Sequence, residues 1–536
     1  MAQATRTRIG GHLVAETLEA LGAEVAFGLP GVHALAIWDG LRSSGIRYLG
    51  FRTELNAAFA ADGYARASGT PTPVLLSTGP GALNSLTAIM EASSAHVPVV
   101  AIASQIPSNL LGRRRGFLHE LRDQAASFEP LVKWTARAED AAEIPELLAE
   151  AWRRAAAPPT GPVFVEIPVD LLTGETEEPA PGGLDGSPGP PPVPDVIEAA
   201  ALLAAAERPV IWAGGGVLRS GAWAELRALA ERLGAAVATT YMGKGAFPED
   251  HPLSLGSGCD EGAFQDALTG ADVLLCVGTE LGAETTGQYT LRPRGRLVQV
   301  DVDPARIGAT YDALPVVGDA RAVLSALADA VPASRREGER LAAETRGRIE
   351  SALAAQGHDL ERGLLRSIRG ALPREAAGAW DMTILAYWAA AHFPALEPRR
   401  FLYPLGSGTL GYAWPASLGA SAATGAPTLA VVGDGGFLYG IGELATARQN
   451  GLAAKLLVVD DGGYGILREY QRESFGETFA VDLVQPDFAA LSAAFAVPSR
   501  VAAPESLEDD LRWALDTDGP ASVVLRAHLE MWAPTS

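Results

Sequence analysis

Two glycine-flanked acidic clusters follow apolar segments in the last third of the chain. Gly433-Asp434-Gly435-Gly436 comes directly after residues 428–432, and Asp460-Asp461-Gly462-Gly463 comes directly after residues 454–459. Residues 440–450 between them have a helical pattern, which predicts a βαβ unit with both clusters at the carboxyl ends of parallel strands. Ligands of open α/β sheets bind outside these ends, where glycines and helix N-termini receive phosphate groups and carboxylates bind Mg²⁺. The pattern therefore predicts that Asp434 and Asp461 share one divalent cation beside a bound phosphate group.

Each acidic cluster also has a simpler interpretation. Gly-Asp-Gly is common in tight turns, and an Asp-Asp pair can cap a helix. The occurrence of both clusters in one βαβ unit favours the cation site over two unrelated turns.

Glu54 is a second candidate for chemistry, because it opens a helical pattern over residues 55–67 that is otherwise rich in alanine. A carboxylate at a helix N-terminus can simply interact favourably with the helix dipole, which is worth about 0.3–1 kcal/mol. A buried carboxyl in this position can also give and take a proton near neutral pH. The glycine-rich segment 77–84 follows, and a further one, residues 406–415, precedes a predicted helix; taken alone, each is an ordinary turn.

His33 and His119 are candidates for proton transfer. His33 follows the first predicted strand, residues 24–27, and His119 lies in Phe117-Leu118-His119-Glu120. Histidine relays protons at neutral pH. An ordinary hydrogen-bonded histidine remains the alternative for each.

The elements that must position these residues fall into three blocks, residues 1–175, 195–335 and 371–528. A segment rich in Pro, Gly and Glu, residues 174–194, and a charged helical connector over 335–370 separate them. Near-continuous apolar strands alternate with helices, which is typical of parallel sheets covered on both faces. The predicted fold class is α/β, with three doubly wound parallel-sheet domains.

Composition excludes several classes of partner. The chain has 536 residues, with 64 Asp and Glu against 42 Lys and Arg and a formal net charge of −22, which disfavours a nucleic-acid partner. No apolar segment reaches the roughly 18 residues of a membrane span. The two cysteines, Cys259 and Cys276, cannot form a disulfide framework. We therefore expect a cytoplasmic protein with no nucleic-acid or membrane partner.

Taken together, these motifs resemble those of thiamine-diphosphate-dependent enzymes, in the branch that contains acetolactate synthases, benzoylformate decarboxylases and benzaldehyde lyase. The resemblance extends from about residue 8 to 528 and implies a pyrimidine-binding domain (1–175), a central domain (195–335) and a diphosphate- and metal-binding domain (371–528). It implies thiamine diphosphate and Mg²⁺ as cofactors. Some relatives bind FAD in the central domain, but no flavin site is apparent here and we expect none.

The resemblance also implies roles for individual residues. Asp434, Asp461 and the Gly463 carbonyl are the implied metal ligands, and Glu54 is the implied acid that activates the pyrimidine ring. Gly408 is implied to accept from the pyrimidine amino group and Leu410 to wedge the cofactor into a bent shape. The other implied cofactor-binding residues are Pro80, Asn84, Gly433, Gly435, Gly436, Phe437, Tyr464 and Gly465.

The sequence departs from the family pattern at two places. Asp460-Asp461 stands where the family usually has two asparagines, which predicts altered metal affinity or pH dependence. His33 matches a histidine of benzaldehyde lyase, whereas His119 lies where that lyase and acetolactate synthases have glutamine. Both histidines are candidate catalytic residues.

Three functions remain open at this point. The leading prediction is an acetolactate-synthase-like enzyme that decarboxylates a 2-oxo acid and transfers the acyl carbanion equivalent to a carbonyl acceptor. The second is a nonoxidative 2-oxo acid decarboxylase or a 2-hydroxy ketone lyase. The third is a non-catalytic cofactor-binding protein, which has no chemical need for Glu54. The resemblance further implies a homodimer or homotetramer with the active site between chains, and small 2-oxo acid or 2-hydroxy ketone substrates.

Overall fold

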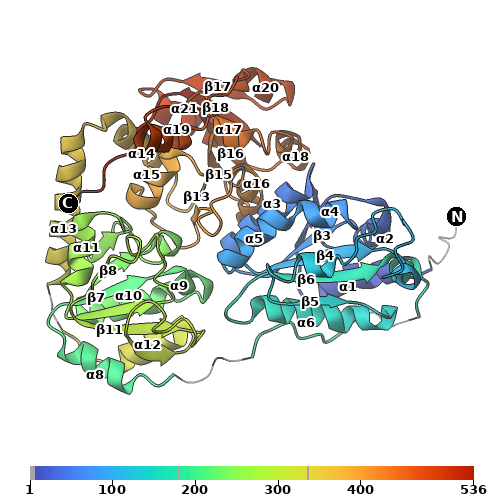
Figure 1. Cartoon of the computed structure of the whole chain (residues 1–536), viewed down its shortest axis with the longest axis horizontal. Helices are drawn as coiled ribbons and strands as arrows, with labels where there is room; N and C mark the ends of the chain where they lie inside the picture. Colours follow the sequence, from blue (N-terminus) through green and yellow to red (C-terminus); the bar gives the residue numbers. More distant parts are fainter. Residues whose placement is uncertain (1–6, 178–180, 190, 192–193, 335–336, 536) are drawn as a thin grey trace. The chain divides into compact units, whose positions relative to one another are not determined.

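The computed structural model describes residues 7–177, 181–189, 191, 194–334 and 337–535. Helices and strands alternate along the chain, and the strands form three six-stranded parallel sheets (Figure 1). The chain divides into two compact units. The first contains residues 1–189, 406–428 and 439–454, and the second contains residues 190–405, 429–438 and 455–536.

The first sheet has the strand order β2-β1-β3-β4-β6-β5, and all its neighbouring strands are parallel. The order reverses between β1 and β3, and in open α/β sheets ligands bind outside the carboxyl ends of the strands at such a point. Its strands are β1 (Val25–Gly28), β2 (Arg47–Gly50), β3 (Thr72–Leu76), β4 (Val99–Gln105), β5 (Thr135–Arg137) and β6 (Val163–Pro168).

Two groups of helices cover this sheet. Helix α1 packs against α2, α6 and α7, whereas α3 packs against α5. The helices are α1 (Gly10–Ala20), α2 (Leu35–Leu41), α3 (Glu54–Ser68), α4 (Pro80–Asn84), α5 (Leu86–Ser94), α6 (Ile144–Ala156) and α7 (Val169–Thr173), with short 3-10 turns at Val32–Ala34, Ser108–Leu110, Ala125–Ser127 and Ala141–Glu143.

The second sheet has the order β12-β11-β10-β7-β8-β9, again parallel throughout. Its strands are β7 (Pro209–Ala213), β8 (Ala236–Thr239), β9 (Ser254–Gly256), β10 (Val273–Val277), β11 (Arg296–Asp301) and β12 (Leu314–Val317). Its helices are α8 (Ile197–Ala205), α9 (Gly215–Arg219), α10 (Trp223–Leu233), α11 (Gly262–Thr269) and α12 (Ala320–Ala330), with a 3-10 turn at Tyr241–Gly243. Cys276 lies in β10 and is fully buried, as expected of a small core residue.

The third sheet has the order β14-β13-β15-β16-β18-β17 and is also parallel. Its strands are β13 (Ala377–Trp380), β14 (Phe401–Leu402), β15 (Thr428–Gly433), β16 (Ala454–Asp460), β17 (Ser499–Ala502) and β18 (Ala521–Arg526). The helices in this part of the chain are α15 (Ile384–His392), α16 (Ala413–Thr424), α17 (Asp434–Phe437), α18 (Glu443–Asn450), α19 (Gly465–Phe475), α20 (Phe488–Ala494) and α21 (Leu507–Asp516), and α13 (Gly338–Gln356) and α14 (Asp359–Ala371) form the connector. Of these, α16 and α18 belong to the first unit.

These sheets confirm the predicted fold class of three doubly wound parallel-sheet domains. The boundaries of the predicted domains stay a prediction. The predicted linker falls partly outside the described residues, at 178–180, 190 and 192–193. The predicted helix over 440–450 is wrong at its start, since α18 begins at Glu443. Gly440 and Gly442 precede that start, and glycine is a poor helix former.

Close packing of α3 against α16 fixes part of the first unit. A Cβ added to Gly419 would lie 1.9 Å from the Ala60 carbonyl oxygen, and one added to Gly63 would lie 2.1 Å from the Ala416 carbonyl oxygen. Only glycine permits such close approach of two helix backbones. This contact ties the helix that begins at Glu54 to the helix that follows the glycine-rich residues 406–412.

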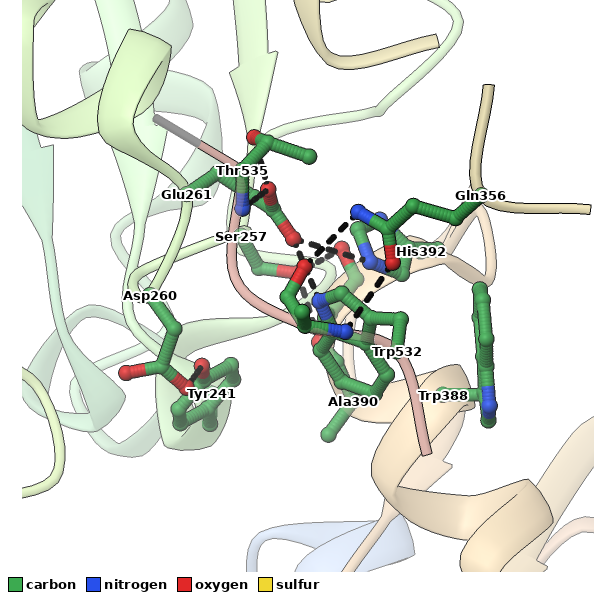
Figure 2. A network of polar contacts seen from close by, with 12 residues as sticks. Tyr241, Ser257, Asp260, Glu261, Gln356, Trp388, Ala390, His392, Trp532 and Thr535 are labelled. Atoms are coloured by element: carbon green, nitrogen blue, oxygen red, sulfur yellow. Dashed lines mark hydrogen bonds and ion pairs between the residues drawn. The ribbon is translucent and has the colours of Figure 1, made fainter. Parts of the chain in front are cut away.

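Trp532 and Thr535 form hydrogen bonds with Glu261 (Figure 2). The indole nitrogen of Trp532 donates to Glu261 Oε1 at 2.6 Å, and the Thr535 backbone nitrogen donates to Oε2 at 2.9 Å. His392 Nε2 lies 3.3 Å from the same carboxylate, and Gln356 exchanges two hydrogen bonds with the backbone of Ala533. Residues 532–535 are thereby part of the second unit.

Among the described residues, none of the helices has the length and apolar character needed to cross a membrane.

Candidate active site

Asp434 lies where β15 ends and α17 begins. Its side chain is buried; Oδ1 accepts from the Gly435 backbone nitrogen at 2.8 Å, and Oδ2 has no hydrogen-bond partner. Burial raises the pKa of Asp434 to about 7, and the negative charges of Asp461 and Asp460 add to that shift. A buried, unpartnered carboxylate oxygen is unfavourable unless a ligand meets it.

Asp461 follows β16, the neighbour of β15 in the sheet, so the two carboxylates lie at adjacent strand ends. Its Oδ1 is also buried without a partner. Burial raises the pKa of Asp461 as well, with Arg468 opposing the shift. The N-terminus of α19 approaches it so closely that a Cβ on Gly465 would lie 1.9 Å from Asp461 Oδ2. Two unpartnered oxygens on neighbouring carboxylates fit a hard divalent cation.

Glycines and one aromatic ring complete this edge of the sheet. Gly463 has φ +155, and its Cβ would lie 2.2 Å from the Val481 carbonyl oxygen. A Cβ on Gly435 would lie 2.7 Å from the Tyr464 ring, and the Phe437 ring packs on Phe488 with centroids 5.9 Å apart. Protein atoms therefore pack so closely against Gly435 and Gly463 that a side chain does not fit at either position.

Sequence reasoning missed a third carboxylate at the same edge. Asp381 follows β13, which adjoins β15 where the strand order reverses, and it is buried. A Cβ on Gly436 would lie 3.2 Å from Asp381 Oδ2, and the Met382 backbone nitrogen donates to Oδ1 at 2.8 Å. The sequence did contain a signal for this residue, because Asp381 comes directly after the apolar strand β13. Among the described residues there is no cluster of three or more His, Cys, Asp or Glu side chains suited to a metal.

Glu54 begins α3 in the first unit, four residues after β2. The Thr53 side chain caps the helix by accepting from the Asn56 backbone nitrogen at 3.2 Å. Glu54 is 9% exposed, and its Oε2 accepts from Asn84 Nδ2 at 3.0 Å. A Cβ on Gly81 would lie 3.0 Å from Glu54 Oε1. The carboxylate is thus more than a helix-dipole partner: it is buried against α4, which contains the predicted residues Pro80 and Asn84.

The structure brings His33 and His119 together, although they are far apart in the sequence. Their ring centroids lie 5.1 Å apart, and Nδ1 of each is buried without a partner. Burial lowers the pKa of His33, and the charge of His119 lowers it further. His119 has φ +67, and its carbonyl oxygen would lie 2.6 Å from a Cβ on Gly79. The histidine pair therefore lies beside the turn that begins α4.

Strand order explains why these side chains converge. His33 follows β1, Glu54 follows β2 and Ser77 follows β3, and the three strands are neighbours in the sheet. Ser77 links the groups, because a Cβ on Gly31 would lie 2.3 Å from its Oγ and a Cβ on Gly81 would lie 3.1 Å from its Cβ.

Sequence reasoning also missed Gln124, which is fully buried. Its Oε1 accepts from the Gly79 backbone nitrogen at 2.7 Å, and its Nε2 donates to the Ser104 carbonyl and to Glu166. Gln124 therefore holds the backbone of the turn at Gly79 in place. Nothing in its local sequence distinguishes it from a surface glutamine.

Gly408 and Leu410 lie in the first unit, in the loop before α16. Gly408 has φ +67 and Gly411 has φ +80, a left-handed conformation that favours glycine. Leu410 is half-buried.

Comparison with known proteins adds to this geometry. Residues 8–127 match the family model "Thiamine pyrophosphate enzyme, N-terminal TPP binding domain", residues 196–327 match the "central domain" model, and residues 381–525 match the "C-terminal TPP binding domain" model. A "probable 2-ketoarginine decarboxylase" of Pseudomonas aeruginosa is 37% identical over 98% of this chain and 95% of its own length. The chain belongs to the thiamine pyrophosphate enzyme family.

Two further similar proteins support the same family assignment. A "probable acetolactate synthase large subunit" of Methanocaldococcus jannaschii is 34% identical over 95% of this chain and 90% of its own length. The crystal structure of "a putative thiamin diphosphate-dependent enzyme" from Mycobacterium smegmatis superposes with a TM-score of 0.80 at 25% identity, covering 97% of this chain and 99% of that one. The chain is accordingly a thiamine-diphosphate-dependent enzyme of the decarboxylase and carboligase class.

Proposed function

We propose that Asp434, Asp461 and the Gly463 carbonyl bind Mg²⁺, which anchors the diphosphate of the cofactor. The observation that carries this proposal is the pair of buried carboxylate oxygens without partners, Asp434 Oδ2 and Asp461 Oδ1, at two adjacent strand ends. A divalent cation neutralises both charges, and its remaining octahedral positions suit phosphate oxygens and water. The glycines at 433, 435, 436 and 465, with Phe437 and Tyr464, would line the diphosphate.

Glu54 would bind a ring nitrogen of the pyrimidine and exchange a proton with it. Its burial and its single side-chain donor, Asn84, leave one oxygen available for that contact. Gly408 would accept from the pyrimidine amino group, and Leu410 would support the bend of the cofactor. When bound, thiamine diphosphate supplies an electron sink for breaking or forming the bond next to a carbonyl.

The proposed reaction is decarboxylation of a 2-oxo acid, followed by transfer of the acyl group to a carbonyl acceptor. The acetolactate synthases among the relatives support this assignment. In this reaction His33 and His119 would protonate the oxygen of the acceptor, since each has a buried ring nitrogen without a partner.

A second candidate is release of an aldehyde without ligation. The histidine pair favours it because a proton donor in this position can also end the reaction by protonation at carbon. The relative named 2-ketoarginine decarboxylase supports the same outcome and suggests a 2-oxo acid with a guanidinium side chain as a substrate to test.

A product analysis separates these functions. Purified protein with thiamine diphosphate and Mg²⁺ is supplied with pyruvate, 2-oxobutanoate, benzoylformate and 2-oxo-5-guanidinopentanoate, each with and without an aldehyde acceptor. Carbon dioxide, free aldehyde and hydroxy ketone are measured separately, and Glu54→Gln serves as the control for chemistry without the activating acid. Hydroxy ketone supports the first function and free aldehyde the second. No carbon dioxide with any of these 2-oxo acids contradicts both functions and supports a non-catalytic cofactor-binding protein.

We also propose a homodimer or homotetramer in which Glu54 of one chain meets Asp434 of another, as the family resemblance implies. Light scattering coupled to gel filtration tests this directly, and a monomer that is fully active would contradict it. Cytoplasmic location stays a prediction.

A further inference from the structure

Glu91 is a fully buried carboxylate in α5 that the proposed chemistry does not use. Both its oxygens contact the loop that carries Gly408 and Leu410. The Ser407 backbone nitrogen donates to Oε2 at 2.7 Å and the Ser407 hydroxyl donates to Oε2 at 2.9 Å. The Gly406 backbone nitrogen donates to Oε1 at 3.3 Å, and Arg66 donates to Oε1 at 2.8 Å.

The other end of the loop has a matching anchor in α3. The Tyr412 hydroxyl donates to Asp62 Oδ1 at 2.7 Å, and Asp62 is fully buried. Arg66 joins the two anchors, because its Nε donates to Asp62 at 2.7 Å while its Nη2 donates to Glu91. The Arg66 guanidinium also lies over the Tyr412 ring, 5.3 Å from its centroid.

Only residues 408–411 lie between the two anchors. Gly408 and Gly411 both have positive φ, so the backbone of this short segment turns sharply twice. With its ends fixed by buried carboxylates, the direction of the Gly408 carbonyl and the place of the Leu410 side chain follow from the anchors. The first anchor is closely packed, because a Cβ on Gly406 would lie 2.9 Å from Glu91 Oε1.

Burying a carboxylate is unfavourable unless each oxygen is matched by donors. An apolar residue at position 91 would avoid that penalty, but it would leave the Ser407 nitrogen and hydroxyl without an acceptor. Hydrogen bonds to an ionised acceptor are shorter and stronger than neutral ones, which suits the task of holding a glycine-rich loop.

We propose that Glu91 and Ser407 are positioning residues that preset the 408–411 segment for the pyrimidine half of the cofactor. Neither residue touches the cofactor; both act through the backbone of the loop. The inference rests on the proposed roles of Gly408 and Leu410, and it predicts a defect confined to the pyrimidine half of thiamine diphosphate.

The test compares two probes on the full-length protein by isothermal titration calorimetry: thiamine diphosphate with Mg²⁺, and inorganic pyrophosphate with Mg²⁺. Glu91→Gln keeps the size of the side chain but removes the charge and one acceptor oxygen. We expect its Kd for thiamine diphosphate to rise about tenfold and its Kd for pyrophosphate to stay within about twofold of wild type. Ser407→Ala, which loses only the hydroxyl bond, should show a smaller rise of about threefold in the same direction.

Glu150→Gln is the matched control, since Glu150 is ion-paired with Arg153 and Arg154 on α6 and lies outside the loop. It should leave both constants unchanged. Hydrogen exchange supplies an independent readout: the Ser407 amide should exchange faster in Glu91→Gln than in wild type.

Unchanged thiamine diphosphate affinity in both variants, or an equal loss for both probes, would overturn the proposal. If Glu91→Gln does not fold, Ser407→Ala alone decides, because it removes a single hydrogen bond. Failure of the wild-type protein to take up thiamine diphosphate with Mg²⁺ would instead defeat the proposed function, so the two failures are distinguishable.

Discussion

Replacement of Asp461 by asparagine tests whether the two carboxylates act as one cation site. A metal ligand must be deprotonated, so metal affinity is lost as the pH falls through the pKa of the ligand. The pKa of Asp434 is raised to about 7 by burial, with the charges of Asp461 and Asp460 contributing. At that pKa about one tenth of Asp434 is ionised at pH 6 and about nine tenths at pH 8. The Mg²⁺ affinity of the wild-type protein should therefore rise at least about tenfold between these pH values.

Asp461→Asn removes one of the charges that raise the pKa of Asp434, so this pKa should fall. Two effects follow, with opposite consequences at the two ends of the pH range. At pH 8 the variant should require more Mg²⁺ than wild type, because an anionic ligand has become a neutral one. Between pH 8 and pH 6 its affinity should fall less steeply than that of wild type, because Asp434 stays ionised.

The assay is the Mg²⁺ concentration needed for half-maximal thiamine diphosphate binding at pH 6, 7 and 8. The protonation of thiamine diphosphate itself is common to both proteins, so the ratio of variant to wild type isolates the protein groups. Asp509→Asn is the matched control, since Asp509 lies in α21, where its side chain is 86% exposed and paired with Arg512. The same pH dependence in wild type and Asp461→Asn would refute the shared-site reasoning.

Three further predictions concern single residues. Glu54→Gln should lower turnover at least about 100-fold, while the Kd for thiamine diphosphate changes less than about threefold, as measured by steady-state kinetics and calorimetry. Near-normal turnover would remove Glu54 from the mechanism. Gly419→Ala should lower the thermal midpoint of unfolding, because overpacking of α3 against α16 costs about 1–3 kcal/mol. Its control is Gly347→Ala on the exposed face of α13, where nothing lies within 4 Å of the added Cβ; this change should leave the midpoint unchanged or raise it slightly. His119→Gln should raise the pKa of His33, followed by NMR of ¹³C-labelled histidine, because the charge of His119 is the second cause of its lowered value; an unchanged pKa would show that burial alone accounts for the shift.

Much of the architecture was predictable, because buried parallel strands are nearly continuous apolar runs. The segments 428–432 and 454–459 correspond closely to β15 (Thr428–Gly433) and β16 (Ala454–Asp460). Edge strands such as β5, with partly exposed residues, lack this signature. The start of α18 was misjudged because periodicity continues through Gly440, where the backbone does not remain helical.

Parts of the site were predictable for a related reason. Asp434 and Asp461 stand directly after apolar strands, so chain position alone places them at the carboxyl edge of a sheet. Gln124 and Glu91 lack such a signal, since their partners are Gly79 and Ser407, which are distant in the sequence. The contact between His33 and His119 depends on the turn at Gly79, so the sequence alone could not predict it either.

The central claim, a divalent cation at Asp434 and Asp461 that anchors thiamine diphosphate, is tested most directly by equilibrium binding. Thiamine diphosphate is titrated into the purified protein with Mg²⁺, with a chelator in place of Mg²⁺, and into Asp434→Ala with Mg²⁺. We predict saturable uptake in the first case alone. Uptake that persists in the chelator and in Asp434→Ala, or no uptake by the wild-type protein with Mg²⁺, would contradict it.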